Sequence, residues 1–95
     1  MVRIFDYTDY RQYLADYYDH RKTESPGFSY TVLARKAGFK NKGFLHNVIH
    51  GHKNLSKTSV VKLSQALEHT RTQAEYFENL VFFNQAAGQI GRAQV

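Results

Sequence analysis

Aromatic and apolar residues recur every three or four positions in the first part of the chain. The residues in this stripe are Tyr10, Tyr13, Leu14, Tyr17 and Tyr18. Such spacing places side chains on one face of an α-helix, whereas a strand would alternate at every second residue. Asp6 is positioned to cap this helix, with Asp9 in its first turn, where the helix dipole favours negative charge. The breaker cluster Ser25-Pro26-Gly27 predicts that the helix ends near Lys22.

Two short helices are predicted next. Ser29 is a suitable N-cap for a helix over residues 30–37, and Asn41 is placed to cap one over about 42–50. Each helix is followed by a glycine that can adopt the left-handed conformation of a C-terminal cap, at Gly38 and Gly51. The apolar side of the second short helix comprises Phe44, Leu45, Val48 and Ile49.

Caps and apolar stripes mark the remaining helices. Ser56 is a suitable N-cap for a fourth helix, whose apolar residues are Val60, Val61, Leu63, Ala66 and Leu67. Thr70 and Gln73 have the spacing of a capping box, and the helix that follows contains Tyr76, Phe77, Leu80 and Val81. No stretch has a convincing strand pattern. We therefore predict an all-α fold, a compact bundle of about five helices over residues 1–86, with a flexible tail at 87–95.

The composition agrees with one small folded domain. The chain has 95 residues, of which 42% are hydrophobic, enough for a single core. It has no cysteine, which excludes a disulfide scaffold, a thiolate metal site and a cysteine nucleophile. It also has no apolar run near the roughly 20 residues that span a bilayer, and no signal-peptide pattern at its start. We therefore expect a cytoplasmic protein with no membrane contact.

Charge is distributed unevenly along the chain. Residues 25–67 contain seven lysines and arginines and no aspartate or glutamate, which leaves a net charge of −2 on the flanking segments. A basic segment without acids is typical of proteins that bind a polyanion such as a nucleic acid. The alternative is a solvated surface that happens to be basic, although such surfaces usually mix both signs.

The basic segment coincides with a helix-turn-helix pattern over residues 29–51. This motif requires a small residue where the two helices approach, and Ala34 meets that requirement. It also requires a turn residue such as Gly38, and apolar residues on the second helix that face the core, as Leu45 and Val48 would. The pattern resembles the Xre, or lambda-repressor-like, family of DNA-binding domains. The interval from Gly38 to Gly51 is one residue longer than usual there, and we place the extra residue within 40–43.

A second resemblance covers nearly the whole chain. Its motifs are Phe5-Asp6-Tyr7, Tyr10-Arg11, Tyr13-Leu14, Asp16-Tyr17-Tyr18, Phe28-Ser29-Tyr30, Ala34-Arg35-Lys36-Ala37-Gly38-Phe39, Gly43-Phe44-Leu45, Asn54-Leu55-Ser56, Ala74-Glu75-Tyr76-Phe77, Leu80-Val81 and Phe83-Asn84-Gln85-Ala86. These resemble the N-terminal region of a bacterial paralogous family noted in Fibrobacter and in Bdellovibrio-like predators. The resemblance implies a helix-turn-helix region that, in longer members, precedes a C-terminal domain of unknown function. The resemblance therefore implies one of two alternatives, an effector domain beyond this chain or a naturally short member of the family.

These patterns together predict a double-stranded DNA-binding module of a bacterial transcriptional regulator. The second helix of the motif would enter the major groove. The candidate base contacts are Lys40, Asn41, Lys42, His46, Asn47 and His50. The candidate phosphate contacts are Ser29, Tyr30, Arg35, Lys36, Lys53 and Lys57. For Asn41 the competing role is that of a helix cap.

The last helix offers a candidate dimer surface. Phe82 and Phe83 lie off its main apolar stripe, so they either form an interface between two copies or pack beneath the first helix. Dimerisation would lengthen the DNA site that is read. A protein-interaction module that uses the aromatic helices is the main alternative to DNA binding, and RNA binding is a third reading.

No catalytic residue, cofactor site or metal site is predicted. His46 and His50 are four residues apart on a helix and His52 is close by, a spacing that can chelate a metal. However, the metalloprotease pattern requires a glutamate where this chain has Asn47, and the segment contains no acid or cysteine. The sequence also lacks a nucleophile-elbow motif and a glycine-rich phosphate loop.

Overall fold

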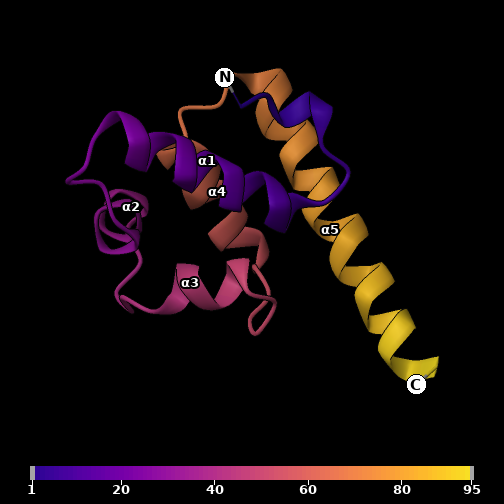
Figure 1. Cartoon of the computed structure of the whole chain (residues 1–95). Coiled ribbons are helices and arrows are strands. Elements are labelled where there is room, and N and C mark those ends of the chain that lie inside the picture. Colours follow the sequence, from indigo (N-terminus) through magenta and orange to yellow (C-terminus); the bar gives the residue numbers. More distant parts are fainter. Residues whose placement is uncertain (1, 95) are drawn as a thin grey trace.

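Five α-helices and one short 3-10 helix make up the regular structure of the computed structural model, which describes the backbone of residues 2–94 and the side chains of residues 2–87 (Figure 1). In chain order they are η1 (Ile4–Asp6), α1 (Tyr10–Glu24), α2 (Tyr30–Ala37), α3 (Phe44–Ile49), α4 (Lys57–Ala66) and α5 (Arg71–Gln94). No strand occurs within the described residues. The prediction of an all-α bundle is confirmed.

The start of α1 differs from the sequence prediction. Asp9, not Asp6, is the N-cap, and its carboxylate accepts hydrogen bonds from the backbone N–H groups of Arg11 and Gln12. Asp6 lies instead at the end of η1, because the buried side chain of Ile4 anchors the preceding segment, which packs against α5. Tyr7 is consequently extended, and its carbonyl accepts a hydrogen bond from the Tyr76 hydroxyl.

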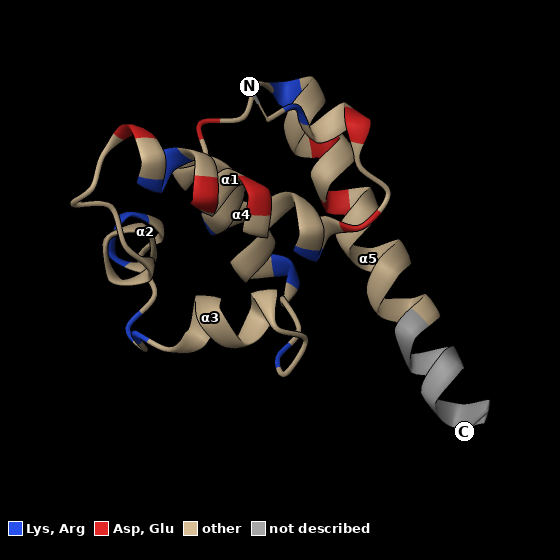
Figure 2. Ribbon diagram, in the orientation of Figure 1, with Lys and Arg blue, Asp and Glu red and all other residues tan. Residues whose placement is uncertain are grey.

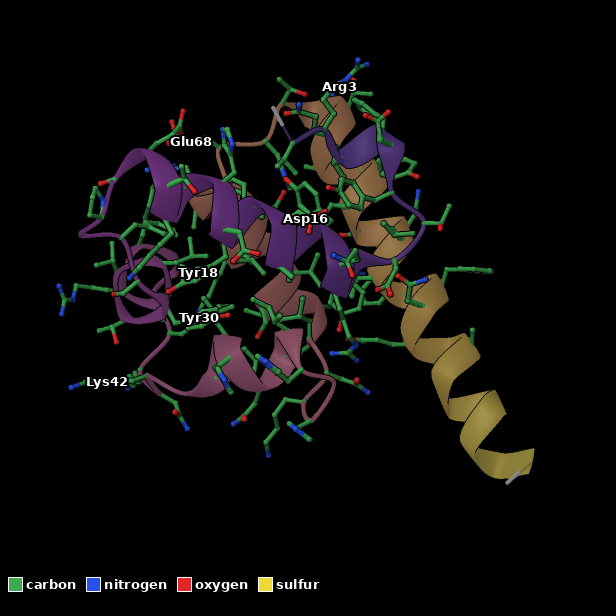
Figure 3. The ribbon with its side chains drawn as sticks, viewed as in Figure 1. Arg3, Asp16, Tyr18, Tyr30, Lys42 and Glu68 are labelled. Carbon is green, nitrogen blue, oxygen red and sulfur yellow. The ribbon has the colours of Figure 1, made fainter. Side chains whose placement is uncertain are left out.

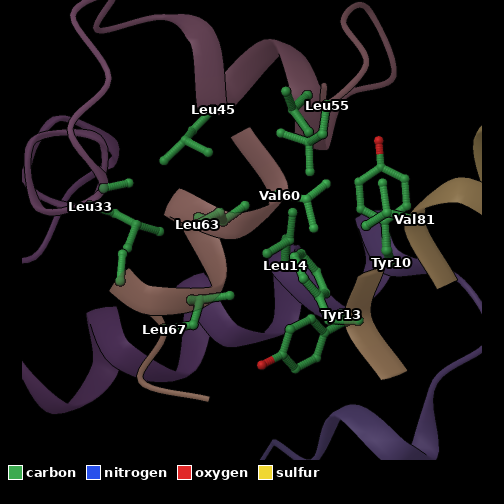
Figure 4. Packing of buried hydrophobic residues seen from close by; sticks show 14 of the residues in the cluster. Tyr10, Tyr13, Leu14, Leu33, Leu45, Leu55, Val60, Leu63, Leu67 and Val81 are labelled. Atoms are coloured by element: carbon green, nitrogen blue, oxygen red, sulfur yellow. The ribbon is translucent and has the colours of Figure 1, made fainter. Parts of the chain in front are cut away.

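The core forms around α4, which packs against both α2 and α5. Figure 4 shows Leu63 of α4 surrounded by Leu14 of α1, Leu33 of α2 and Leu45 of α3. The buried apolar residues are Ile4, Tyr10, Tyr13, Leu14, Phe28, Leu33, Ala34, Ala37, Leu45, Val48, Leu55, Val60, Leu63, Ala66, Leu67, Phe77, Leu80 and Val81. The predicted apolar stripes therefore face the core. Val61 is the exception, because its side chain is 46% exposed.

A hydrogen-bonded chain of polar side chains crosses the interior between α1 and α4. The Tyr13 hydroxyl lies 2.8 Å from Nε2 of His69, and Nδ1 of His69 lies 2.8 Å from the Ser64 hydroxyl. Both ring nitrogens of His69 are therefore engaged. Burial lowers the pKa of His69 to about 4 and raises the pKa of Tyr13, so both groups are neutral at pH 7.

The caps of the last two helices agree with the sequence. The Ser56 hydroxyl accepts a hydrogen bond from the Ser59 N–H, and Thr70 and Gln73 form the reciprocal bonds of a capping box. Helix α5 continues past the rest of the bundle (Figure 1). The predicted flexible tail, 87–95, lies almost wholly outside the residues with described side chains. None of the described helices combines the length and apolar character needed to traverse a lipid bilayer.

Candidate nucleic-acid interface

Helix α3 has one buried face and one exposed face. Leu45 and Val48 are fully buried, and the half-buried rings and chains of Phe44 and Ile49 flank them. On the opposite side, His46 and His50 are exposed, and Asn47 is half-buried. Because the polar side of α3 is not covered by another helix, it is available to a ligand. This is the arrangement that the sequence predicted for the second helix of the motif.

The beginning of α3 is later than predicted. The helix starts at Phe44, with Gly43 as its N-cap and no side-chain capping bond. The Asn41 side chain instead accepts a hydrogen bond from the Gly43 N–H at 2.8 Å, which closes a turn one residue before the helix. Asn41 therefore caps the turn rather than α3 itself. As a result, Lys40 and Lys42 lie in the turn between α2 and α3, not on the helix.

Each of the helices α2 and α3 is followed by a left-handed glycine. Gly38 has a φ of 84°, and the N–H of the next residue, Phe39, bonds the carbonyl of Ala34 at 2.8 Å. Gly51 has the same φ, and the N–H of His52 bonds the carbonyl of Asn47 at 2.8 Å. These are Schellman motifs, which end a helix sharply and turn the chain away. They hold the basic turns close to the two ends of α3.

Arg11 of α1 holds the C-terminal end of α3. Its guanidinium donates hydrogen bonds to the carbonyl of Val48, to the carbonyl of Lys53 at 2.9 Å and to Oδ1 of Asn54 at 2.8 Å. The same group lies over the ring of Tyr10, 4.8 Å from its centroid. A cation is favourable at this place because the last carbonyls of a helix carry partial negative charge. Sequence reasoning missed this role, since Arg11 is 37 residues from Val48.

Helix α5 holds the loop that follows α3. The Gln85 side chain accepts a bond from the N–H of Leu55 at 2.7 Å and donates one to the carbonyl of Leu55 at 3.0 Å. The neighbouring Asn84 accepts a bond from the N–H of Tyr10 at 2.8 Å. One sequence signal was present for these roles: the pair Asn84-Gln85 interrupts an apolar run in the last helix. Arg11 and Gln85 together fix α3 and its loop to the rest of the bundle.

Positive charge flanks α3 on both sides. Figure 2 shows basic residues in the segments before and after α3, and no acidic residue of the described chain along that edge. Lys40 and Lys42 precede the helix, Lys53 follows it, and all three side chains are exposed. The acidic residues lie on η1, α1, α5 and their connections. The molecule therefore has a basic edge centred on α3.

A hollow of about 280 Å³ lies between the α2–α3 turn and α4. Its lining includes Lys40, Asn41, Ser59 and Lys62, together with Phe39 and Phe44, whose rings meet edge to face at 5.0 Å. Ser59 and Lys62 were absent from the predicted contacts, because only the tertiary structure brings α4 beside the turn. Lys57, at the start of α4, is exposed as expected for a phosphate contact.

Lys36 does not belong to this basic edge. Its ammonium forms an ion pair with Glu68 at 2.8 Å, and the pair lowers the pKa of that carboxyl group. Figure 3 shows Glu68 on the opposite side of the molecule from Lys42 and α3. Lys36 is thus paired with Glu68 away from α3, and its contact with phosphate stays a prediction. The ion pair forms because the chain turns at Glu68, whose φ of 59° is left-handed, where α4 ends beside α2. Arg35 is exposed on α2.

The start of α2 is partly occupied by its own side chains. The Ser29 hydroxyl caps the helix by accepting a bond from the N–H of Val32 at 3.2 Å. The ring of Tyr30 stacks on Tyr18 with centroids 3.9 Å apart, as Figure 3 shows, and meets the ring of His46 at 5.5 Å. Burial raises the pKa of Tyr30. Tyr30 therefore packs α2 against α1 and α3, and Ser29 has the capping role predicted for it.

The aromatic residues of α5 and the histidines of α3 complete the predicted site residues. Phe82 and Phe83 are 37% and 70% exposed, so the alternative that both pack beneath α1 is wrong.

The rings of His46 and His50 stack with centroids 4.1 Å apart. Within the part of the chain that the structure describes, no group of three or more histidine, aspartate or glutamate side chains could hold a metal ion.

No protein-family model, curated protein or solved structure matches the chain.

Proposed function

We propose that this domain binds double-stranded DNA by placing the exposed face of α3 in the major groove. The observation that carries the proposal is the polar side of α3, uncovered and flanked at both ends by lysines without a neighbouring acid. Phosphate groups attract such an edge, and the groove is wide enough to admit a helix. The resemblance to Xre-like proteins adds the proposal that the domain serves a cytoplasmic bacterial transcriptional regulator.

Individual contacts follow from the position of each side chain. Asn47 can form the paired hydrogen bonds that recognise adenine, and His46 and His50 lie one turn apart on the same exposed side. Lys42, in the turn before α3, is placed to reach a guanine or a phosphate. Lys40 and Lys62 line the hollow beside the turn, where a phosphate would meet two cations and the Ser59 hydroxyl. Lys53 would contact the backbone at the other end of α3.

Charge reversal tests this proposal directly. Lys42→Glu combined with Lys53→Glu changes the charge at both ends of α3 and should abolish binding to a random duplex. Arg3→Glu combined with Arg71→Glu makes the same change in charge at two exposed residues, and Arg3 lies far from Lys42 in Figure 3. We expect this control to retain most of the affinity. Equal losses in both double variants would mean that only net charge matters, and would refute an interface at α3.

Salt dependence supplies a second, quantitative readout. Each phosphate contact should steepen the plot of log affinity against log salt by roughly 0.9. Substitution of Lys62 by glutamine should therefore reduce the slope by about that amount, whereas Arg71→Gln should not change it. Absence of binding to any duplex at low salt would remove the proposal, and tighter binding to an RNA duplex of the same sequence would favour RNA instead.

A protein-interaction function is the second candidate, and the exposed ring of Phe83 favours it. Aromatic side chains are enriched at protein interfaces, where burial of a large ring is favourable. A second copy of the chain is the partner that would also serve DNA binding, because two α3 helices read a longer site than one. The double variant Lys42→Glu/Lys53→Glu should leave such an interface intact.

A further inference from the structure

We propose that the hollow between the α2–α3 turn and α4 binds a small aromatic anion, a single aromatic ring that carries a phosphate or carboxylate group. The hollow of about 280 Å³ is lined by two phenylalanines, Phe39 and Phe44, and by a set of polar side chains. The DNA contact proposed above uses only the polar set, through one phosphate. The aromatic part of the lining has no role in that contact, and a ligand with both a ring and a charge would use it.

The polar side chains of the hollow offer hydrogen-bond donors. The ammonium groups of Lys40 and Lys62 can only donate. Oδ1 of Asn41 already accepts a bond within its own turn, so the amide is left with its NH₂ donors. The Ser59 hydroxyl oxygen accepts a bond from the Ser56 hydroxyl at 3.0 Å, which leaves the proton of Ser59 to donate. Such a set of donors is suited to an anion, whose oxygens only accept.

Both lysines are available to a ligand. Their side chains are exposed, and neither takes part in an ion pair among the described residues, in contrast to Lys36, which is paired with Glu68. The surrounding segment, residues 25–67, contains no aspartate or glutamate. An anion therefore displaces no acidic partner when it enters the hollow, and it is attracted by two cations at once.

Phe39 and Phe44 supply the surface for an aromatic ring. Their rings meet edge to face, with centroids 5.0 Å apart and an interplanar angle of 71°. Both side chains are half-buried and pack against the core, which holds the pair in place while part of each stays accessible. Aromatic rings attract one another at centroid distances of about 4.5–7 Å, so a third ring can join the pair. The lining therefore favours an aromatic anion over inorganic phosphate.

The volume of the hollow limits the size of the ligand. Pockets for drug-sized molecules measure roughly 300–1,000 Å³. At about 280 Å³ the hollow lies just below that range. It is suited to one ring with one anionic group, whereas a dinucleotide is too large. Aryl phosphates and aromatic carboxylates share this chemistry, and the test below separates them.

Occupation of the hollow would regulate DNA binding, in a consequence that rests on the proposed function. Lys40 and Lys62 are also the cations that would meet a DNA phosphate there. The aromatic anion and the DNA would therefore compete, and each would lower the affinity of the other by the same factor. The domain would release DNA when such a molecule accumulates.

Titration of the ¹⁵N-labelled full chain, followed by NMR, tests the site without DNA. Phenyl phosphate should shift the amides of Phe39 and Ser59 and bind about two- to tenfold more tightly than inorganic phosphate, because it adds a ring contact. Benzoate should shift the same amides if a carboxylate suffices, and benzylamine, which has the ring but a positive charge, should not bind. Equal affinities for phenyl phosphate and inorganic phosphate, or shifts spread over the whole basic edge, would overturn the site.

Variants of the lining supply matched controls. Lys40→Gln and Lys62→Gln should each weaken phenyl phosphate binding by about two- to fivefold, whereas Arg71→Gln removes one charge outside the hollow and should leave it unchanged. Phe44→Leu should lower the affinity for phenyl phosphate to that for inorganic phosphate, and Phe83→Leu should not. Circular dichroism verifies the fold of each variant. If Phe44→Leu does not fold, the comparison of the two phosphates on the wild type decides. Losses in Arg71→Gln as large as in Lys62→Gln would contradict the assignment.

Competition with DNA is measured separately. Phenyl phosphate should weaken duplex binding by the wild type more than inorganic phosphate does at the same ionic strength. A duplex that binds while no aromatic anion does would overturn the ligand site and leave the proposed function standing. Binding of the aromatic anion to a chain that binds no duplex would support the site and remove the proposed function. Unchanged duplex affinity at saturating phenyl phosphate would refute the competition.

Discussion

Removal of the Arg11 guanidinium tests how α1 holds the end of α3. Arg11→Met keeps an unbranched side chain but deletes the bonds to Val48, Lys53 and Asn54. The Val48 carbonyl is partly buried, and a bond to it from a charged donor contributes roughly 1.5–3 kcal/mol. The other two acceptors are exposed and regain bonds to water. We therefore expect the free energy of unfolding to fall by about 2–3 kcal/mol.

The assay combines urea unfolding with amide hydrogen exchange. Exchange should accelerate first at the amides of His50 and His52, which close the end of α3 by bonding the carbonyls of His46 and Asn47. Gln12→Met is the matched control, because the Gln12 side chain bonds Asp16 at the surface. We expect this control to change stability by less than about 0.5 kcal/mol. Similar losses in both variants, or unchanged exchange at the end of α3, would refute the reasoning.

Three further predictions concern other parts of the bundle. Because burial lowers the pKa of His69 to about 4, the unfolded chain takes up a proton first, and stability should fall as the pH drops from 6.5 to 4. The loss should be on the order of 3 kcal/mol, and urea titrations of His69→Gln should give a flatter pH profile; an identical profile would contradict this role. Gly38→Ala should cost about 1–2 kcal/mol in thermal unfolding, because φ is 84°. Gly43→Ala should cost less, since φ is −86° and no atom lies within 3.6 Å of the new methyl group; equal costs would exclude backbone angle as the cause. Phe83→Glu should remain folded, because the ring is 70% exposed, and sedimentation should show a monomer where the wild type dimerises. A wild type that stays monomeric at high concentration would exclude this dimer surface.

Much of the local structure could be predicted because its causes are local. Ser29, Ser56 and the Thr70–Gln73 box cap their helices as predicted, since each bonds a backbone group three residues away. Gly38 adopts the left-handed conformation that was predicted for it, because glycine, without a Cβ atom, takes this conformation at lower cost than other residues. Helical periodicity likewise predicts that Leu45 and Val48 are buried and that His46 is exposed, and the structure agrees.

Two differences from the sequence predictions involve partners distant in the chain, whereas the later start of α3 has a local cause, the bond from the Gly43 N–H to the Asn41 side chain. Asp9, not Asp6, caps α1, because burial of Ile4 in the core holds Asp6 in the preceding 3-10 helix. Lys36 was expected to contact phosphate, but the turn that ends α4 places Glu68 beside it. Periodicity and charge could not reveal either contact, since both depend on how whole helices pack.

The sequence by itself determined which residues form helices, where most of them begin and end, and that the positive charge gathers around the second and third helices. Those features arise from hydrogen bonds and backbone preferences that span three or four residues. Only the tertiary structure decided which cations share an edge with α3, that Arg11 and Gln85 hold its C-terminal end and the loop that follows it, and that the ring of Tyr30 packs against His46. The physical reason is that each of these depends on the relative placement of separate helices, which is set by burial of the shared core.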